Sequence, residues 1–209
     1  MEKNTKSKLI PFILTGVVII LDQVTKALVC KFIPLYTIGA QFFGDFLRII
    51  HVRNPGVAFS FGAGWPDGLR RIAFSIIPII VLCLVIGVYL RNKDFTRLQQ
   101  WAICGVVGGG FGNIIDRIFR PAGVVDFIDI KFYGLFGLER WPTFNVADSA
   151  VVVCGILLAV SFLVLIIKEM IQARAARKNA EEKAYRVLDC FPHWVFIDRG
   201  LIDLLFRFG

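Results

Sequence analysis

Residues 101–119 read WAICGVVGGGFGNIIDRIF, and this stretch decides the fold. It approaches the length of about 20 predominantly apolar residues that a membrane-spanning helix needs. Two pairs of its glycines lie four residues apart, Gly105 with Gly109 and Gly108 with Gly112. This spacing lets helix backbones approach each other closely in a membrane. The stretch therefore predicts a spanning helix at the packed centre of a helix bundle.

Three more apolar stretches of similar length occur in the chain of 209 residues. Hydrophobic residues make up 56% of the chain, compared with about 45–50% in soluble domains. The four predicted spans are 9–32, 71–90, 101–119 and 147–167. We predict an all-α polytopic membrane protein with four transmembrane helices. One membrane domain would cover residues 1–170, and a tail of unknown role, 171–209, would follow it in the cytoplasm.

The basic residues flank these spans, and the formal net charge is +8. They precede the first span at 3–8, fill the short connection 91–97, and follow the fourth span at 168–186. Nucleic-acid binding would favour a single basic stripe, so we predict no nucleic-acid partner. The positive-inside tendency predicts that both termini are cytoplasmic, although Arg70 and Arg71 run against it.

The two outer connections carry structure of their own. In region 43–64, β-prone runs at 46–53 and 57–61 flank the turn signal Asn-Pro-Gly at 54–56. This pattern predicts a small sheet or hairpin at the membrane surface. Segment 131–142 is rich in aromatic residues of the kind that settle at headgroup level, which predicts a short interfacial element.

Charged side chains within a span are costly unless they face a partner or water, so each one suggests function. Asp22 and Lys26 lie one helical turn apart in the order that favours an ion pair, and a purely structural salt bridge is the alternative. Asn113, Asp116 and Arg117 share one face of the third span, where Arg117 can pair with a carboxylate. A structural or orienting network is the alternative for this group.

Two further polar groups lie at the ends of spans. Asp126 stands in the apolar sequence VVDF, and burial there should raise the pKa of its carboxyl. Asn145 and Asp148 stand at the start of the fourth span, where ordinary helix capping explains them equally well.

With cytoplasmic termini, all of these groups fall at the outer end of their spans. Two neighbouring carboxylates share a proton, so that one can activate water while the other polarises the scissile carbonyl. The pattern therefore predicts a hydrolytic site. His51 and His193 are the only histidines, and neither lies in the HExxH motif of zinc peptidases, so we expect no metal. Serine catalysis lacks its GxSxG elbow.

Five motifs occur in order along the chain: DQVTK (22–26), NPGVAFS (54–60), GNIIDR (112–117), VVDF (124–127) and FNVADS (144–149). Together they resemble the motif series of the lipoprotein signal peptidase family over about residues 9–167. The resemblance implies four spanning helices, a small extracytoplasmic β-cradle and a short periplasmic helix over the site. It implies neither a metal nor an organic cofactor.

The resemblance also implies roles for individual residues. Asp126 and Asp148 correspond to the family's catalytic aspartates, and Asp116 to a residue that acts through Arg117. The positions that shape the site or hold substrate are Asp22, Lys26, Asn54, Gly56, Ala58, Asn113, Asp116, Arg117 and Asn145. Val57 stands where the family usually has alanine, and the tail has no counterpart in the family.

In this family the substrate is a prolipoprotein whose lipobox cysteine carries diacylglycerol, and cleavage occurs on the amino side of that cysteine. The resemblance implies an inner-membrane peptidase with its site near the outer face, where the signal helix and the acyl chains arrive without leaving lipid. Besides substrate, we expect membrane lipids as partners and a monomeric enzyme. Two alternatives are a small proton-coupled transporter, which would place its polar residues near the midplane, and a non-catalytic membrane adaptor.

Overall fold

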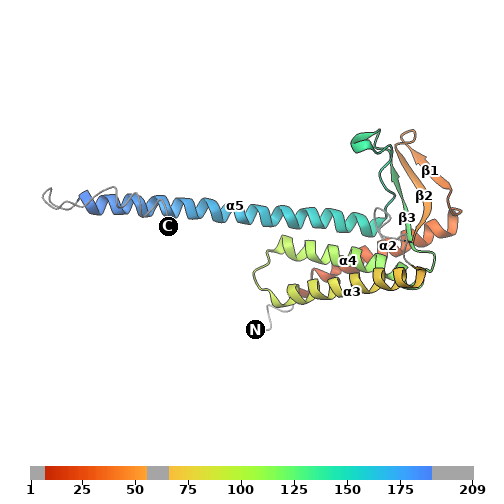
Figure 1. Cartoon of the computed structure of the whole chain (residues 1–209), viewed down its shortest axis with the longest axis horizontal. Coiled ribbons are helices and arrows are strands. Elements are labelled where there is room, and N and C mark those ends of the chain that lie inside the picture. The colour runs from red at the N-terminus through yellow and green to blue at the C-terminus, as the bar shows by residue number, and fades with distance from the viewer. Residues whose placement is uncertain (1–7, 56–65, 190–209) are drawn as a thin grey trace. The chain divides into compact units, whose positions relative to one another are not determined.

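The computed structural model describes residues 8–55 and 66–189 of the chain (Figure 1). Its long helices are α2 (Phe12–Phe32), α3 (Asp67–Arg91), α4 (Arg97–Phe119) and α5 (Val146–Asp189). Each contains a stretch long and apolar enough to cross a membrane. This confirms the predicted polytopic fold with four spanning helices.

The chain falls into two compact units, Met1–Ala159 and Val160–Gly209. The first contains α2, α3, α4, the sheet and the beginning of α5. Helix α5 itself is uninterrupted over 44 residues, which at about 1.5 Å per residue is roughly twice the thickness of a bilayer core. The predicted boundary between a membrane domain and a tail near residue 170 remains a prediction.

Helix α4 is the packed centre of the first unit. A Cβ placed on Gly108 would lie 3.0 Å from backbone atoms of Thr15 on α2. A Cβ on Gly112 would lie 2.8 Å from the Asp22 carboxylate and 3.0 Å from the Cβ of Ala147. The glycines thus let α2 and the start of α5 approach α4 closely, as the small-residue spacing predicts.

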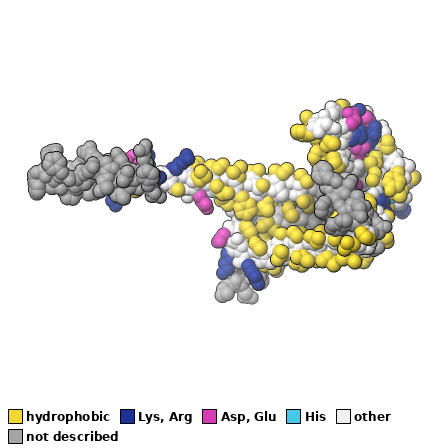
Figure 2. All heavy atoms as spheres, in the orientation of Figure 1, with side chains coloured by type: hydrophobic (Ala, Val, Ile, Leu, Met, Phe, Trp, Pro, Cys, Tyr) yellow, Lys and Arg dark blue, Asp and Glu magenta, His cyan; other side chains and the backbone are white. Residues whose placement is uncertain are grey.

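The apolar surfaces divide between a core and an outer face. Buried Leu82 and Tyr89 of α3 pack with Ile103 and Val107 of α4 in one cluster. Large apolar side chains on α2, α3 and α5 remain exposed in the described chain, and Figure 2 shows them as a continuous hydrophobic covering along the helices. This distribution suits helices whose outer faces contact lipid.

The three strands form an antiparallel sheet in the order β1 (Ile38–Phe42), β2 (Leu47–Asn54) and β3 (Val124–Ile130). Figure 1 shows the strands running across one end of the helices. The carboxyl end of β2 pairs with the amino end of β3, where Val52 lies opposite Asp126 and Asn54 opposite Val124. The sheet therefore brings Asn54 beside the strand that carries Asp126.

The structure confirms the predicted small sheet. Residues 47–53 of the predicted run 46–53 lie in β2, which pairs with β1 and β3. The predicted run 57–61 lies outside the described residues. Pairing with β3 joins segments about 70 positions apart, which local sequence signals do not reveal.

Segment 131–142 forms tight turns, including the short element η2 (Leu135–Gly137). Phe136 within it has φ 55° and ψ 24°, so the backbone is left-handed there. Between β3 and α5, η2 is the one helical element, and it is a single turn. The implied periplasmic helix over the site is not among the elements of residues 8–55 and 66–189.

Gly108→Val should destabilise the protein by about 1–3 kcal/mol, because the added carbons meet the Thr15 backbone and Val18. Gly16→Val is the matched control, since a Cβ at Gly16 has nothing within 4 Å. Thermal unfolding in detergent measures both variants. Equal midpoints would contradict the close approach of α2 and α4.

Candidate active site

Lys26 is fully buried, and its ammonium donates to three oxygens. Its Nζ lies 2.8 Å from Asp22 Oδ2, 3.2 Å from Asp116 Oδ2 and 3.0 Å from Asn113 Oδ1. An ammonium has three N–H donors, so these contacts satisfy it. The predicted pair of Asp22 with Lys26 is confirmed, and the same ammonium joins α2 to α4.

The two carboxylates bound to Lys26 each accept a backbone N–H from another element. Asp22 Oδ1 accepts the N–H of Ala147 at 2.9 Å, at the start of α5. Asp116 Oδ2 accepts the N–H of Val125 at 3.0 Å, on β3. In each case the next residue along the chain is a predicted catalytic aspartate. The ion cluster thus fixes the backbone immediately before each of them.

Two further members of this cluster were not predicted. Gln23 Nε2 donates to Asp22 Oδ2 at 3.1 Å, to Asp116 Oδ1 at 3.1 Å and to the Gly112 carbonyl at 3.0 Å. Arg120 forms an ion pair with Asp116 Oδ1. Two cations therefore balance two carboxylates. The i,i+4 spacing of Asp116 and Arg120 is the signal that could have identified this pair.

Asp126 is buried on β3, with 4% of its surface exposed. Asn145 Nδ2 donates to its Oδ1 at 2.7 Å, and Asn54 Nδ2 donates to its Oδ2 at 3.1 Å. Burial and, second, the nearby charge of Asp148 raise the pKa of Asp126 to about 6, against the effect of the two amides. This direction is the one that the apolar neighbours of Asp126 predict.

Asn145 and Asp148 cap the start of α5 reciprocally. The N–H of Asp148 donates to Asn145 Oδ1 at 2.9 Å, and the N–H of Asn145 donates to Asp148 Oδ2 at 3.1 Å. Asn113 Nδ2 donates to Asp148 Oδ1 at 2.7 Å. The capping alternative is therefore correct for the backbone. The same side chains also join the site, because the Asn145 amide reaches Asp126.

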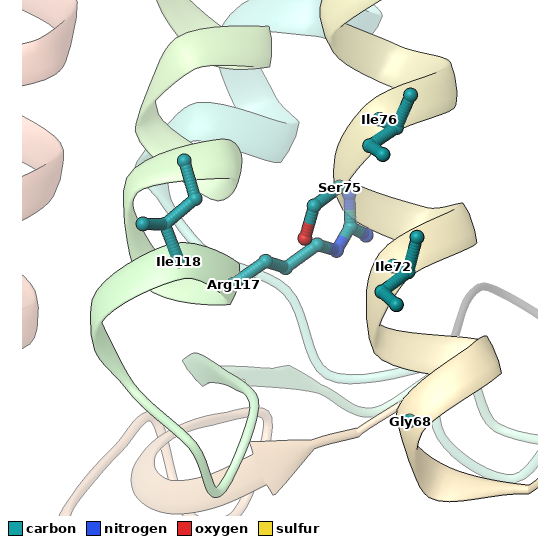
Figure 3. Close-up of a pocket in the computed structure, with 6 residues that line it drawn as sticks. All are labelled: Gly68, Ile72, Ser75, Ile76, Arg117 and Ile118. Atoms are coloured by element: carbon teal, nitrogen blue, oxygen red, sulfur yellow. The ribbon is translucent and has the colours of Figure 1, made fainter.

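Arg117 occupies a different place from the predicted one. In Figure 3 its side chain points from α4 towards α3 and lies beside Ser75. The two residues line a cavity of about 400 Å³, whose other lining residues are Gly68, Ile72, Ile76 and Ile118. Adjacent residues of a helix point about 100° apart, so Asp116 and Arg117 cannot both face α2. Arg120 pairs with Asp116 instead.

Two of the predicted site residues, Gly56 and Ala58, lie outside the described residues. Within residues 8–55 and 66–189, no group of three or more His, Cys, Asp or Glu side chains could hold a metal ion.

The geometry agrees with comparisons to known proteins. The family model for signal peptidase (SPase) II matches residues 14–164. The chain belongs to the signal peptidase II family. It is therefore a hydrolase, which decides against the transporter and adaptor alternatives, and its four apolar helices place it in the bacterial inner membrane.

Relatives of this signal peptidase II are similar over most of their length. The lipoprotein signal peptidase of Treponema pallidum (strain Nichols) is 48% identical over 163 residues, covering 78% of this chain and 88% of the relative. That of Treponema denticola is 48% identical over 166 residues, covering 79% and 95%. A solved bacterial membrane enzyme is 31% identical with a TM-score of 0.63, covering 73% of this chain and 87% of that one.

Lys26→Met should destabilise the protein by about 3–5 kcal/mol, because it leaves two buried carboxylates without their shared cation. Arg177→Met is the matched control. Arg177 has the same i,i+4 relation to Glu181, but that pair is exposed and 3.6 Å long, so its loss should cost less than about 0.5 kcal/mol. Unfolding in detergent measures the stability of both variants. Similar losses of stability would contradict the conclusion that the Lys26 ion pairs stabilise the fold.

The raised pKa of Asp126 predicts a dependence of stability on pH. The folded protein holds this proton up to about pH 6, whereas the unfolded chain releases it near 3.8. The contribution of Asp126 to stability should therefore be greatest below pH 4, fall as pH rises to about 6, and then level, with a total change of at most about 3 kcal/mol. Asp126→Asn should flatten this part of the profile. An unchanged profile in the variant would show that Asp126 does not titrate there.

Proposed function

We propose that the chain is an aspartic endopeptidase that cleaves diacylglyceryl-modified prolipoproteins on the amino side of the lipidated cysteine. The observation that carries this proposal is the position of Asn145, which caps α5 together with Asp148 and donates to Asp126 at 2.7 Å. It thereby ties a carboxylate of β3 and a carboxylate of α5 to one site. The names of the Treponema relatives support the substrate class.

The different surroundings of the two aspartates suggest their roles. Asp126, with its pKa raised to about 6 by burial, is the acid. Asp148 accepts the Asn113 amide at 2.7 Å and a backbone N–H at 3.1 Å. Two neighbouring carboxylates share one proton, so with Asp126 as the acid Asp148 is the base.

The reaction follows from these roles. Asp148 takes a proton from water, whose oxygen attacks the scissile carbonyl carbon while Asp126 protonates the carbonyl oxygen. A neutral gem-diol results. It collapses as the C–N bond breaks, one diol proton returns to Asp126, and Asp148 gives its proton to the leaving nitrogen. Both carboxyl groups then regain their initial protonation states.

The cavity beside Arg117 suits the approach of the substrate. Its lining is largely apolar, from Ile72, Ile76 and Ile118, and Arg117 supplies the cationic donor (Figure 3). A peptide or ester carbonyl next to apolar chains matches this combination. Arg117 would then hold substrate in this cavity.

The proposed orientation places both termini in the cytoplasm and the site near the outer face. Arg91, Lys93 and Arg97 lie at the end of the bundle opposite the sheet, where Figure 2 shows basic side chains. Lys8 joins them, since its Nζ donates to the carbonyls of Leu90 and Asn92 at 2.8 and 2.7 Å. Basic residues favour the cytoplasmic side of a membrane.

Purified wild-type protein should cleave a diacylglyceryl-modified prolipoprotein before the lipidated cysteine. Asp126→Asn and Asp148→Asn should each lower kcat at least 1,000-fold, because asparagine keeps the size of aspartate but cannot transfer the proton. Mass spectrometry of the products gives both the rate and the bond cut.

Asp129→Asn is the matched control, because Asp129 lies three residues further along β3 and pairs with Arg140 away from the site. It should keep activity within about threefold. The proposal fails if wild type is inert on this substrate while folded, or if either site variant retains full activity.

A further inference from the structure

Three exposed aromatic side chains stand on left-handed backbone at one end of the sheet. Phe43, Tyr133 and Phe136, here called the tip aromatics, have φ angles of 53°, 53° and 55°. Their exposed fractions are 85%, 67% and 82%. Neither the fold's core nor a regular element accounts for them.

An exposed aromatic side chain on left-handed backbone is an unfavourable combination in water. Bulky side chains rarely adopt positive φ, and turns that need it prefer asparagine or aspartate followed by glycine. Each tip aromatic is instead followed by a glycine with positive φ. Around Tyr133 and Phe136 the turns are closed by hydrogen bonds from Leu135 N–H to the Phe132 carbonyl at 3.0 Å and from Leu138 N–H to the Leu135 carbonyl at 3.1 Å. The rings therefore stand where a polar residue would fit the backbone better, which points to a use for them.

The turns that carry the tip aromatics are held together. Phe46, beside the first turn, stacks on Tyr133 with ring centroids 6.4 Å apart. Lys131 Nζ lies 3.0 Å from Asp45 and 5.3 Å from the centroid of the Tyr133 ring. These contacts hold the Tyr133 ring and join the turn after β1 to the turn after β3.

Charged groups beside this surface balance each other. Arg140 Nε lies 2.7 Å from Asp129, and Arg48 Nη2 lies 3.1 Å from Asp45. Lys131 faces Asp45 and Glu139. Three cations thus meet three carboxylates, so the surface offers no surplus charge for a strongly acidic or basic partner. Aromatic rings beside mixed charges match the headgroup layer of a bilayer.

The place of the sheet in the fold supports this partner. Strands β1 and β2 follow the end of α2, and β3 lies between the end of α4 and the start of α5, so the sheet lies where predicted spans end. Its strands run across the ends of the helices (Figure 1). The turns at the far ends of the strands therefore extend sideways from the bundle.

We propose that the tip aromatics insert into the headgroup layer and anchor the sheet to the bilayer. Strand β3 runs from the site at Val124 to Ile130 beside this anchor. The anchor therefore fixes the depth at which β3, and with it Asp126, is held relative to the membrane. This inference does not depend on the proposed reaction.

The test places 4-fluorophenylalanine singly at positions 43, 133 and 136 of the full chain, in nanodiscs of phosphatidylcholine and phosphatidylglycerol. The substitution is nearly isosteric, so the fold should persist. Fluorine relaxation is compared between a lipid with a nitroxide headgroup and a water-soluble gadolinium chelate. Control labels replace Ile80, an exposed residue within the α3 span, and Glu182, an exposed residue late in α5.

The nitroxide lipid should relax the three tip labels at least threefold more strongly than the gadolinium chelate does. Two results would overturn the proposal. If the chelate relaxes the tip labels as strongly as the label at position 182, the rings lie in water. If neither reagent reaches them and the nanodiscs contain two cross-linkable copies, the surface is a protein interface instead.

Discussion

The rest of the site depends on the two ion pairs and the hydrogen bond of the buried Lys26 ammonium. A buried charge is costly unless paired and hydrogen-bonded, and Lys26 meets this condition with Asp22, Asp116 and Asn113. Asp22 accepts the N–H of Ala147 on α5 through its other oxygen, and Asp116 accepts the N–H of Val125 on β3 through the same Oδ2 that contacts Lys26. One cation on α2 thus sets the positions of two elements that are distant in sequence, each just before an aspartate of the proposed dyad.

This arrangement requires helices that approach closely. The glycines of α4 bring its backbone against Thr15 of α2, and Gly112 leaves room for the Asp22 carboxylate. A larger residue there would separate Asp22 from the start of α5. The packing of the bundle and the chemistry of the site are therefore parts of one constraint, which explains why polar residues and glycines interleave within a single span.

Most of the fold was predictable from sequence, because a spanning helix can be recognised from the length of its apolar run. The strands β1 and β3 were not predicted: β1 forms a local hairpin with β2, whereas β3 pairs with β2 from a distant part of the chain, which local sequence signals do not reveal. Within the site, the Asp22–Lys26 pair and the raised pKa of Asp126 followed from spacing and apolar neighbours. The partner of Asp116 did not: Arg117 was the expected partner, whereas Arg120, at the favourable i,i+4 spacing, forms the ion pair. The side chain of Asn145 both caps α5 and donates a hydrogen bond to Asp126.

The central claim is that the Lys26 cluster positions the proposed dyad through two backbone N–H groups. The most direct test is the steady-state kinetics of Asp116→Asn on a diacylglyceryl-modified prolipoprotein, measured across pH on folded enzyme. The account predicts that kcat falls at least tenfold with a shifted pH profile, while KM changes by less than threefold, because β3 is no longer held firmly before Asp126. A folded variant with wild-type kcat and an unchanged pH profile would contradict it.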